Sequence, residues 1–308
     1  MLTLAQAQNL SMDVLLKGII EVIITESEIL AKLPFKTIVG NSLKYNREST
    51  LPTAGFYSVG DTWTESTHTV TQVSSSLTIL GGDADVDEFE KQTLSNINDQ
   101  EAIAISSKSK ALARKWDDTF IYGNATTDTK QFNGLHALAP SAQMLHQGTS
   151  STGAALSLAK LDKLIDLVMP GKPSALIMNR TLRRRIGGYY RGNAGSPQGR
   201  GSEAVPVENY GGIPILIDDW ITQTETISSG AYAAQTGGAC TSIFAVKFGE
   251  DDKGVTGLQN GSIQKTRLGD LETKDAVRWR LKWYCGLALF STLAIARLDG
   301  VTDDVVVV

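Results

Sequence analysis

Residues 98–124 of the chain read NDQEAIAISSKSKALARKWDDTFIYGN, and this stretch decides between the folds open to the sequence. Asn98 and Glu101 have the spacing of a capping box at the start of a helix. Apolar side chains then recur at helical spacing, and lysine and arginine cover most of the remaining surface. We therefore expect one helix that ends at Gly123, roughly 36 Å long at 1.5 Å per residue, which suits the spine of a structural layer. Its apolar stripe consists of Ile105, Leu112, Trp116 and Phe120.

The segment before this helix is polar and extended. Between residues 39 and 82 threonine and serine are abundant, and turn signals occur at 51–55 and at 60–61. The runs 43–47 and 76–80 are typical of strands. A two-stranded ribbon with so few apolar residues cannot form a core of its own. Two interpretations stay open: a meander within a domain, or a projecting hairpin that packs on a neighbouring subunit.

Aspartate alternates with small apolar residues in the sequence DADVD at residues 83–87. A calcium loop is disfavoured, because Glu88 and Leu94 occupy the positions where such a loop needs glycine and a bidentate glutamate. We expect instead a strand in which Ala84 and Val86 face inward and the aspartates are solvated.

The first 38 residues indicate an arm with short helical pieces. Ser27 precedes an apolar turn that Pro34 ends. The N-terminus lacks the basic region and small-residue cleavage site of a signal peptide, and its uncharged stretches are shorter than the ~20 residues of a membrane helix. We therefore expect neither a secretory signal nor a membrane partner.

Helices and strands alternate in the second half of the chain. A stretch rich in serine, threonine and glycine at 147–154 indicates a linker into a second unit, where Ser157 and Asn179 are expected to cap helices. Residues 276–284 alternate apolar and polar side chains at period two, as a half-buried strand does. Further strands are expected at 174–178, 213–217 and 242–248, in an apolar run that continues to Arg297, and at the edge-forming residues 305–308.

The composition argues against an enzyme. The chain has 308 residues, 42% hydrophobic and 20% charged, and its net charge of -4 excludes a basic nucleic-acid coat held by charge neutralisation. Cys240 and Cys285 are too few for a disulfide framework or a four-ligand zinc site, and they favour synthesis in a reducing cytoplasm. Three histidines offer little acid-base chemistry, and Walker, Rossmann and nucleophile-elbow motifs are absent. We expect no catalytic residue, cofactor or metal.

Charged residues of opposite sign are concentrated in separate segments of the second unit. A basic segment contains no acid between residues 167 and 202, and acidic residues follow it. Segments of opposite sign suit a head-to-tail ring in which the basic side of each subunit meets the acidic side of its neighbour. The alternatives are solvated faces and a phosphate or nucleic-acid site, since guanidinium groups bind phosphate. The interface candidates are Arg180, Arg183, Arg184, Arg185, Arg191 and Arg200, the acids Asp218, Asp219, Glu250, Asp251 and Asp252, and Arg47, Glu48 and Glu65 of the extended segment.

A second pair of oppositely charged segments brackets the spine helix. Residues 83–101 are acidic and residues 263–297 are basic. Both are expected beside the spine helix, where they can pair within one subunit or between subunits.

The order of these parts resembles the major capsid proteins of tailed bacteriophages, whose fold is named after phage Hong Kong ninety-seven. The resemblance covers most of the chain: arm, polar hairpin, acidic strand, spine helix and inserted α/β unit. Local sequences that carry it are FIYGN at 120–124, FNGL at 132–135, MNR at 178–180 and GGIPI at 211–215. It implies an α+β fold with an N-terminal arm at 1–38, an extended β-hairpin loop at 39–82, a peripheral domain at 83–150 and 262–308, and an axial domain at 151–261.

The resemblance also implies a function. It describes a structural subunit that self-assembles as hexamers and pentamers into an icosahedral capsid around packaged double-stranded DNA, without sequence-specific binding. We expect a separate scaffolding protein, because the chain has no fused scaffolding segment, together with a portal and a possible decoration protein. The subunit is then a virion component that is made and assembled in the cytoplasm of a bacterial host.

Two alternatives stay open at this stage. Encapsulins, the shells of cellular nanocompartments, share the fold implied by the resemblance. An α/β enzyme that uses the arginine-rich segment on a phosphorylated substrate belongs to a different class.

Overall fold

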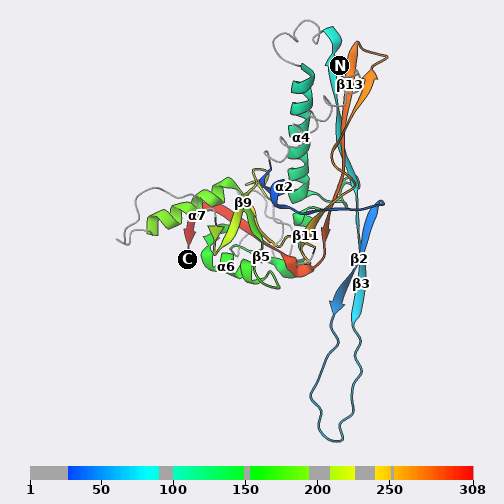
Figure 1. The fold of residues 1–308 in the computed structure, drawn as a ribbon. Helices are drawn as coiled ribbons and strands as arrows, with labels where there is room; N and C mark the ends of the chain where they lie inside the picture. Colours follow the sequence, from blue (N-terminus) through cyan, green and yellow to red (C-terminus); the bar gives the residue numbers. More distant parts are fainter. Residues whose placement is uncertain are drawn as a thin grey trace, which may run out of the picture.

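The computed structural model describes residues 27–89, 100–148, 153–193, 209–225, 240–250 and 253–307. It contains a five-stranded sheet, a seven-stranded sheet and a separate two-stranded hairpin. Figure 1 shows the hairpin projecting from the body on the side opposite the long helix α4. The helices are α2 (Glu28–Lys32), α4 (Gln100–Tyr122), α5 (Leu135–Leu138), α6 (Leu158–Asp166) and α7 (Arg180–Asn193), with short 3-10 turns η1 (Ser141–Gln143) and η2 (Thr292–Ala294).

Strand β13 (Ala276–Leu289) is the centre of the five-stranded sheet. β4 (Thr78–Asp87) pairs with it along one side, and β12 (Gln264–Asp270) and β11 (Val255–Gln259) pair along the other, all antiparallel. β1 (Phe35–Thr37) lies parallel to β11 at the edge. The period-two alternation predicted at 276–284 is confirmed, because the apolar positions of β13 are buried and the basic ones lie toward solvent.

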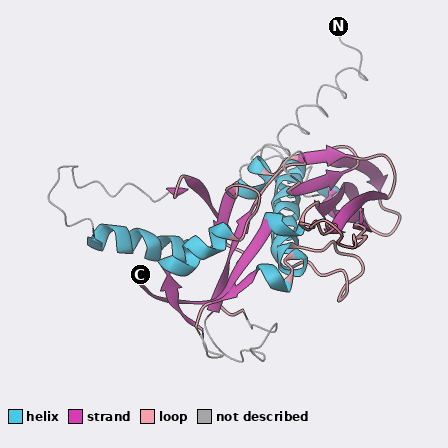
Figure 2. Cartoon of the chain, turned by 90° about the horizontal axis from the view of Figure 1, so that it is seen from below, coloured by secondary structure: helices cyan, strands magenta, loops and turns pink. Residues whose placement is uncertain are grey.

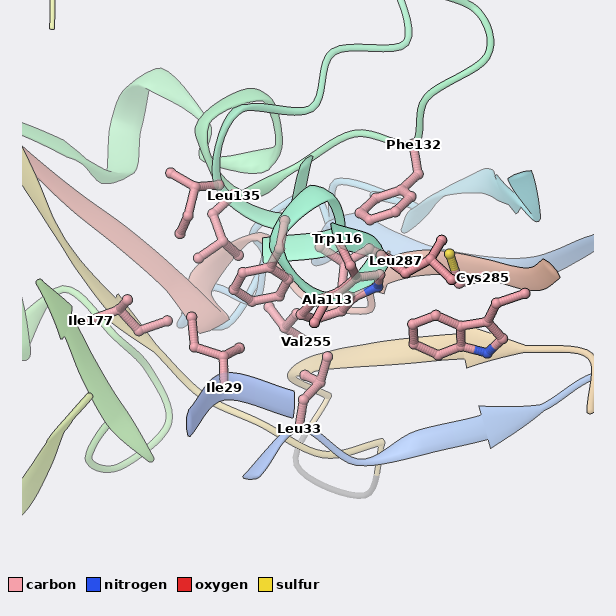
Figure 3. Close-up of a cluster of buried hydrophobic side chains, with 14 of the residues drawn as sticks. Ile29, Leu33, Ala113, Trp116, Phe132, Leu135, Ile177, Val255, Cys285 and Leu287 are labelled. Carbon is pink, nitrogen blue, oxygen red and sulfur yellow. The ribbon is translucent and has the colours of Figure 1, made fainter. Parts of the chain in front are cut away.

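The predicted spine helix is confirmed as α4, and its apolar stripe is buried as expected. Ile105, Leu112, Trp116 and Phe120 each have at most 6% of their surface exposed. The stripe packs on β4 and β13 and, on its far side, on one face of the seven-stranded sheet. Figure 3 shows Trp116 and Ala113 of α4 in one cluster with Ile29 of α2, Ile177 of the second sheet and Leu287 of β13. The proposed capping residue Asn98 lies outside the described residues.

The end of α4 is held by the FNGL sequence. Gly134 donates its N–H to the carbonyl of Gly123 at 2.8 Å, and the Asn133 side chain accepts the N–H of Ala125. A Cβ atom on Gly123 would lie 2.3 Å from the Phe132 carbonyl oxygen, and one on Gly134 would lie 2.5 Å from the Thr119 carbonyl oxygen. The two local sequences singled out by the resemblance therefore pack directly on each other, and only glycine permits that approach.

The central strands of the seven-stranded sheet are buried on both faces. Its strands follow the order β5, β14, β10, β7, β9, β8, and β6 also pairs with β14. Alternate residues face the α4 cluster and a second cluster beneath α6 and α7, so Ile177 belongs to the first and Leu176 to the second. Figure 2 shows the strands in two groups with helices between and beside them. The strands are β5 (Met144–His146), β6 (Ala154–Ser157), β7 (Ala175–Met178), β8 (Asn209–Tyr210), β9 (Ile213–Ile217), β10 (Cys240–Val246) and β14 (Ile295–Val307).

Most elements predicted for the second unit are present. Asn179 caps α7, because its Oδ1 accepts the N–H of Leu182 at 2.9 Å. Ser157 occupies the N-cap position of α6, although its side chain makes no capping hydrogen bond. No helix in the described part of the chain is long and apolar enough to cross a bilayer.

The prediction for the C-terminal strands was wrong in detail. The apolar run 285–297 is not one strand: β13 continues through Leu289, the chain turns at η2, and β14 begins at Ile295. The resemblance implies that residues 262–308 belong to the peripheral domain, and strand pairing places β14 of that range between β5 and β10 in the seven-stranded sheet. A fully apolar run shows burial but does not show which sheet provides it.

The hairpin consists of β2 (Ser42–Thr50) and β3 (Thr69–Ser76). The predicted run 76–80 is divided, because β3 ends at Ser76 and β4, a strand of the five-stranded sheet, begins at Thr78. On the N-terminal side, the Ser27 turn is confirmed as α2, since the Ser27 side chain accepts the N–H of Leu30. The rest of the predicted arm, residues 1–26, lies outside the described residues.

Candidate assembly surfaces

The distal part of the hairpin exposes large apolar side chains with nothing in the same chain to cover them. Phe56 and Val59 are fully exposed, and Trp63 and Leu51 are about three quarters exposed, at 76% and 73%. Monomeric proteins rarely leave such a group of apolar residues in water, and a group of this kind marks an interaction site. The hairpin thus carries an apolar surface at the point farthest from its own body (Figure 1).

This distal loop has a defined shape without a regular strand ladder. Ser66 bridges the two arms, accepting the N–H of Thr53 at 2.9 Å and donating to the Thr53 carbonyl at 3.0 Å. The rings of Tyr57 and Trp63 stack with centroids 4.3 Å apart. The exposed apolar residues therefore lie on a loop whose conformation is held by hydrogen bonds and ring stacking.

The structure separates the three interface candidates of the extended segment. Glu48 on β2 and Glu65 on the distal loop have exposed side chains, as an interface residue of the free subunit requires. Arg47 instead reaches back to the body of its own subunit, where its Nε donates to the carbonyl of Phe290 at 3.1 Å.

Three of the candidate arginines pair with carboxylates of the same chain. Arg180 contacts Asp219 at 2.6 Å, and Arg184 and Arg185 contact Asp303 at 3.2 and 2.5 Å. Asp303 was not predicted as a partner of these arginines. The only signal for it in the sequence was the pair of consecutive aspartates at 303 and 304. Arg183 is half-buried on α7, and the Arg191 side chain and Arg200 lie outside the described residues.

The acidic candidates fall into different environments. Asp219 is 58% exposed beside Arg180, and Glu250 pairs with Lys36. Asp218 is buried and accepts the N–H of Trp220 at 2.7 Å, so it does not offer its charge to a surface. Asp251 and Asp252 lie outside the described residues.

The acidic strand and the basic strand beside the spine helix pair within the chain. Across the β4–β13 ladder, Arg278 faces Asp85 and Arg280 faces Asp83, each with two hydrogen bonds of 2.6–2.8 Å. The hydrogen bond from Arg280 holds the pKa of Asp83 below its usual range, and Arg278 does the same for Asp85. Of the two arrangements left open, the structure has the one within a subunit.

A buried ionic cluster that the sequence did not predict joins the end of α4 to the second sheet. Arg297 of β14 is 1% exposed and lies 3.8 Å from a carboxylate oxygen of Glu225 and 3.6 Å from one of Asp299. Tyr122 at the end of α4 and Ser242 of β10 both donate to Glu225. A buried charge needs such partners, because its desolvation otherwise costs several kcal/mol.

Histidines complete this cluster on either side. His146 of β5 contacts Asp299 at 2.5 Å, and His136 of α5 lies 3.3 Å from Arg297. Burial, with help from the Arg297 charge, lowers the pKa of His136 to about 4. His136 is therefore neutral at physiological pH and accepts a hydrogen bond from the guanidinium. No group of three or more potential metal ligands occurs among the described side chains.

A second pair of buried acids lies where α2 meets the body. Asp117 of α4 accepts the hydroxyl of Ser27 at 2.6 Å, and Asp218 lines the same pocket of about 460 Å³. Burial raises the pKa of both carboxyls to about 7. Glu28 of α2 also accepts the N–H of Ile217, so α2 is attached to both α4 and the second sheet.

These carboxyls predict a stability that depends on pH. The folded pKa of Asp117, about 7, lies above its unfolded value of 3.8, so its contribution is retained at low pH and lost as the pH rises through 7. Between pH 5 and pH 8 this group alone removes roughly 2–3 kcal/mol from the free energy of unfolding. Asp117→Asn should remove that part of the slope in urea titrations across this range.

Asp118→Asn is the matched control, since Asp118 is the next residue on α4 and forms a surface pair with Lys115. It should leave the part of the slope that belongs to Asp117 in place. An Asp117→Asn variant with the wild-type slope would show that Asp117 is ionised in the folded protein.

Comparisons with known proteins establish the fold. No protein-family model matches the chain, and no curated protein matches it. Its structure is similar to that of the SrpI encapsulin from Synechococcus elongatus PCC 7942, with a TM-score of 0.66 and 16% identity over 89% of this chain and 87% of that one. It is also similar to the capsid of a native GTA particle, with a TM-score of 0.64 and 16% identity over 90% and 91%.

A third similar structure comes from Microbacterium phage Oxtober96, with a TM-score of 0.64 and 17% identity over 90% of both chains. All three likenesses span nearly the whole of both proteins, and at these identities they concern the fold. The chain has the α+β fold of tailed-phage major capsid proteins, the Hong Kong ninety-seven type, which the encapsulin shares.

Proposed function

We propose that the chain is the major capsid protein of a tailed double-stranded DNA bacteriophage, which assembles as hexamers and pentamers into an icosahedral shell around the genome. The observation that carries this proposal is the projecting hairpin. Its exposed Phe56, Val59 and Trp63 have no cover in the subunit, and a neighbouring copy in a shell supplies it. The fold shared with phage and GTA capsids supports the same role.

Within this proposal the chain divides into an arm (1–38), an extended loop (39–82), a peripheral domain (83–150 and 262–308) and an axial domain (151–261). The peripheral range holds the spine helix α4, the strands β12 and β13 and the second half of β4, and the axial range holds α6 and α7. β14 of the peripheral range pairs with β10 of the axial range, and β11 of the axial range pairs with β13, so strand pairing links the two proposed domains.

The charged candidates differ in whether they already have a partner of opposite charge in their own subunit. Arg183, Glu48 and Glu65 lie at or near the surface without a carboxylate or guanidinium partner among the described residues. Arg180, Arg184 and Arg185 are 34–73% exposed although each pairs with an aspartate, so they can also reach a neighbouring subunit. Exposed pairs of this kind exchange partners at little cost, because each contributes at most about 1 kcal/mol.

The proposed partners are other copies of the chain, a separate scaffolding protein, a portal, a possible decoration protein and packaged DNA bound without sequence specificity. The proposal assigns no catalytic role. Three of the arginines that a phosphate-binding enzyme would need are already paired with Asp219 and Asp303.

An encapsulin-like shell is the second candidate function. The similarity to the SrpI encapsulin favours it. Both candidates need the same subunit contacts and differ in what the shell contains.

Electron microscopy of the chain expressed in bacteria, alone and with its neighbouring genes, tests the proposal. Closed shells of uniform diameter that package DNA when the neighbouring genes are present support the phage function. Shells filled with protein support the encapsulin function. Small particles under every condition contradict both.

A further inference from the structure

The root of the hairpin is attached to its own subunit at one small site. Apart from the β2–β3 ladder, the described contacts of the hairpin are confined to its base. There Leu43 and Tyr45 pack, together with Phe290, against a cluster of Ile38, Leu258 and Ala288. A ribbon held only at its base keeps its direction only if that base resists rotation.

Two side chains of β2 provide the polar part of the attachment. Tyr45 donates its hydroxyl to the carbonyl of Leu289 at 2.8 Å. Arg47 donates to the same carbonyl at 2.5 Å and to the carbonyl of Phe290 at 3.1 Å. The Arg47 guanidinium also lies 5.9 Å from the centre of the Tyr45 ring, and that ring meets Phe290 edge-on at 4.9 Å.

The hydrogen bonds of Arg47 are arranged so that they can fix the angle at which the hairpin leaves the body. A planar guanidinium that reaches two successive carbonyls is restrained in orientation, whereas a single hydrogen bond would act as a pivot. Among the described residues, Arg47 forms no ion pair with a carboxylate, so its charge-assisted hydrogen bonds serve this attachment.

The carbonyls that Arg47 and Tyr45 contact lie where the chain crosses between the two large sheets. Leu289 is the last residue of β13, and six residues later Ile295 begins β14 of the other sheet. The second crossing lies beside it, because Phe290 and Ser291 donate their N–H groups to the carbonyls of Gly254 and Lys253 in the connection from β10 to β11. We call these two adjacent crossings, at residues 289–291 and 253–254, the joint between the sheets. The hairpin is attached to its own subunit at this joint.

We propose that Arg47 and Tyr45 are positioning residues that fix the direction of the hairpin to this joint. The consequence rests on the proposed shell function: a neighbour meets the apolar distal loop only when the hairpin leaves the body at the correct angle. Arg47 then acts in assembly from inside its own subunit, and not as the direct interface contact that its charge suggested.

Distance measurements on the unassembled subunit test the proposal independently of shell formation. Spin labels on Asp166→Cys in α6 and Glu65→Cys in the distal loop report the hairpin direction by pulsed electron paramagnetic resonance, and native Cys240 and Cys285 are buried. Arg47→Ala should at least double the width of the distance distribution. Arg47→Lys, which can still reach one carbonyl, should give an intermediate width, and Tyr45→Phe should broaden it less than Arg47→Ala.

Lys44→Ala is the matched control, because Lys44 lies on β2 next to Tyr45 with an exposed side chain. It should leave the distribution unchanged. Circular dichroism and the melting temperature identify any variant that fails to fold, and Tyr45→Phe is then the variant to compare. An Arg47→Ala subunit that folds and keeps the wild-type width overturns the proposal.

Assembly provides the second readout. Folded Arg47→Ala subunits should form shells with a wider range of diameters than wild type. If wild type forms no shells under any condition, the proposed function fails while the distance result still decides the role of Arg47. If wild type and Arg47→Ala give identical shells, the consequence for assembly is excluded, and the distance result alone decides whether Arg47 fixes the direction of the hairpin.

Discussion

Replacing Trp116 with alanine should lower the free energy of unfolding by about 3–5 kcal/mol. The Trp116 side chain is fully buried at the centre of the first core. Its ring lies 5.0 Å from that of Phe120, 6.0 Å from Phe35 and 6.1 Å from Trp283, so three elements lose contacts at once. Rigid elements on all sides prevent the site from collapsing, and the cavity adds to the lost transfer energy. Urea unfolding followed by circular dichroism measures the loss.

Two further variants make this test specific. Ser107→Ala, on the exposed face of the same helix, should change stability by less than about 0.5 kcal/mol. Trp116→Phe should cost far less than alanine, because the indole Nε1 is buried without a hydrogen-bond partner among the described residues and its removal relieves that penalty. A loss below about 1 kcal/mol for Trp116→Ala would show that α4 presents a different face to the core.

Elements with a clear periodicity were predictable from the sequence. The stripe from Ile105 to Phe120 and the alternation from Val277 to Trp283 both require one buried face, and one buried face leaves a visible period. The same holds for β4, where Val86 is buried and Asp83 and Asp85 lie on the polar side. Sequence reasoning gave the charge of these aspartates, and only the antiparallel register identifies their partners.

Elements buried on both faces were not predictable to the same depth. β14 is apolar at both faces over its first residues, so nothing in its pattern tells which sheet it joins. Arg297 follows four apolar residues and was read as the end of a strand, although it is buried inside one. Its partner Glu225 lies 72 positions away in a loop, and no local signal connects the two. Contacts of that range depend on topology, which a single sequence does not specify.

The candidate assembly surfaces were likewise predictable only in part from the sequence. The sequence predicted an extended segment without a core, and the fold confirms a projecting hairpin in place of a meander. It did not predict that Arg47 contacts its own subunit, because a lone arginine on a polar strand is equally compatible with a neighbour. Charge indicates that a residue has a partner, whereas only geometry shows in which subunit the partner lies.

Removal of the distal loop should abolish shell formation and leave the subunit folded. Thr50 and Thr69 are paired across the hairpin, so an Asn-Gly turn can replace residues 51–68 and join them directly. The deletion keeps the Arg47 and Tyr45 attachment and removes all four large apolar side chains of the loop. Those side chains contact none of the buried clusters, so the free energy of unfolding should change by less than about 0.5 kcal/mol.

A double substitution separates apolar contact from loop length. Phe56→Ser with Trp63→Ser keeps the length of the loop but removes its two largest exposed apolar rings, and it should reduce the yield of shells as the deletion does. Thr62→Ser, on the same loop, is the matched control and should assemble as well as wild type, because Thr62 is exposed and is not among the interface candidates. Sedimentation and electron microscopy measure closed shells against free subunits. If the deletion variant assembles at the wild-type yield, the distal loop is not an assembly surface, and the contacts that close the shell must lie on the body of the subunit.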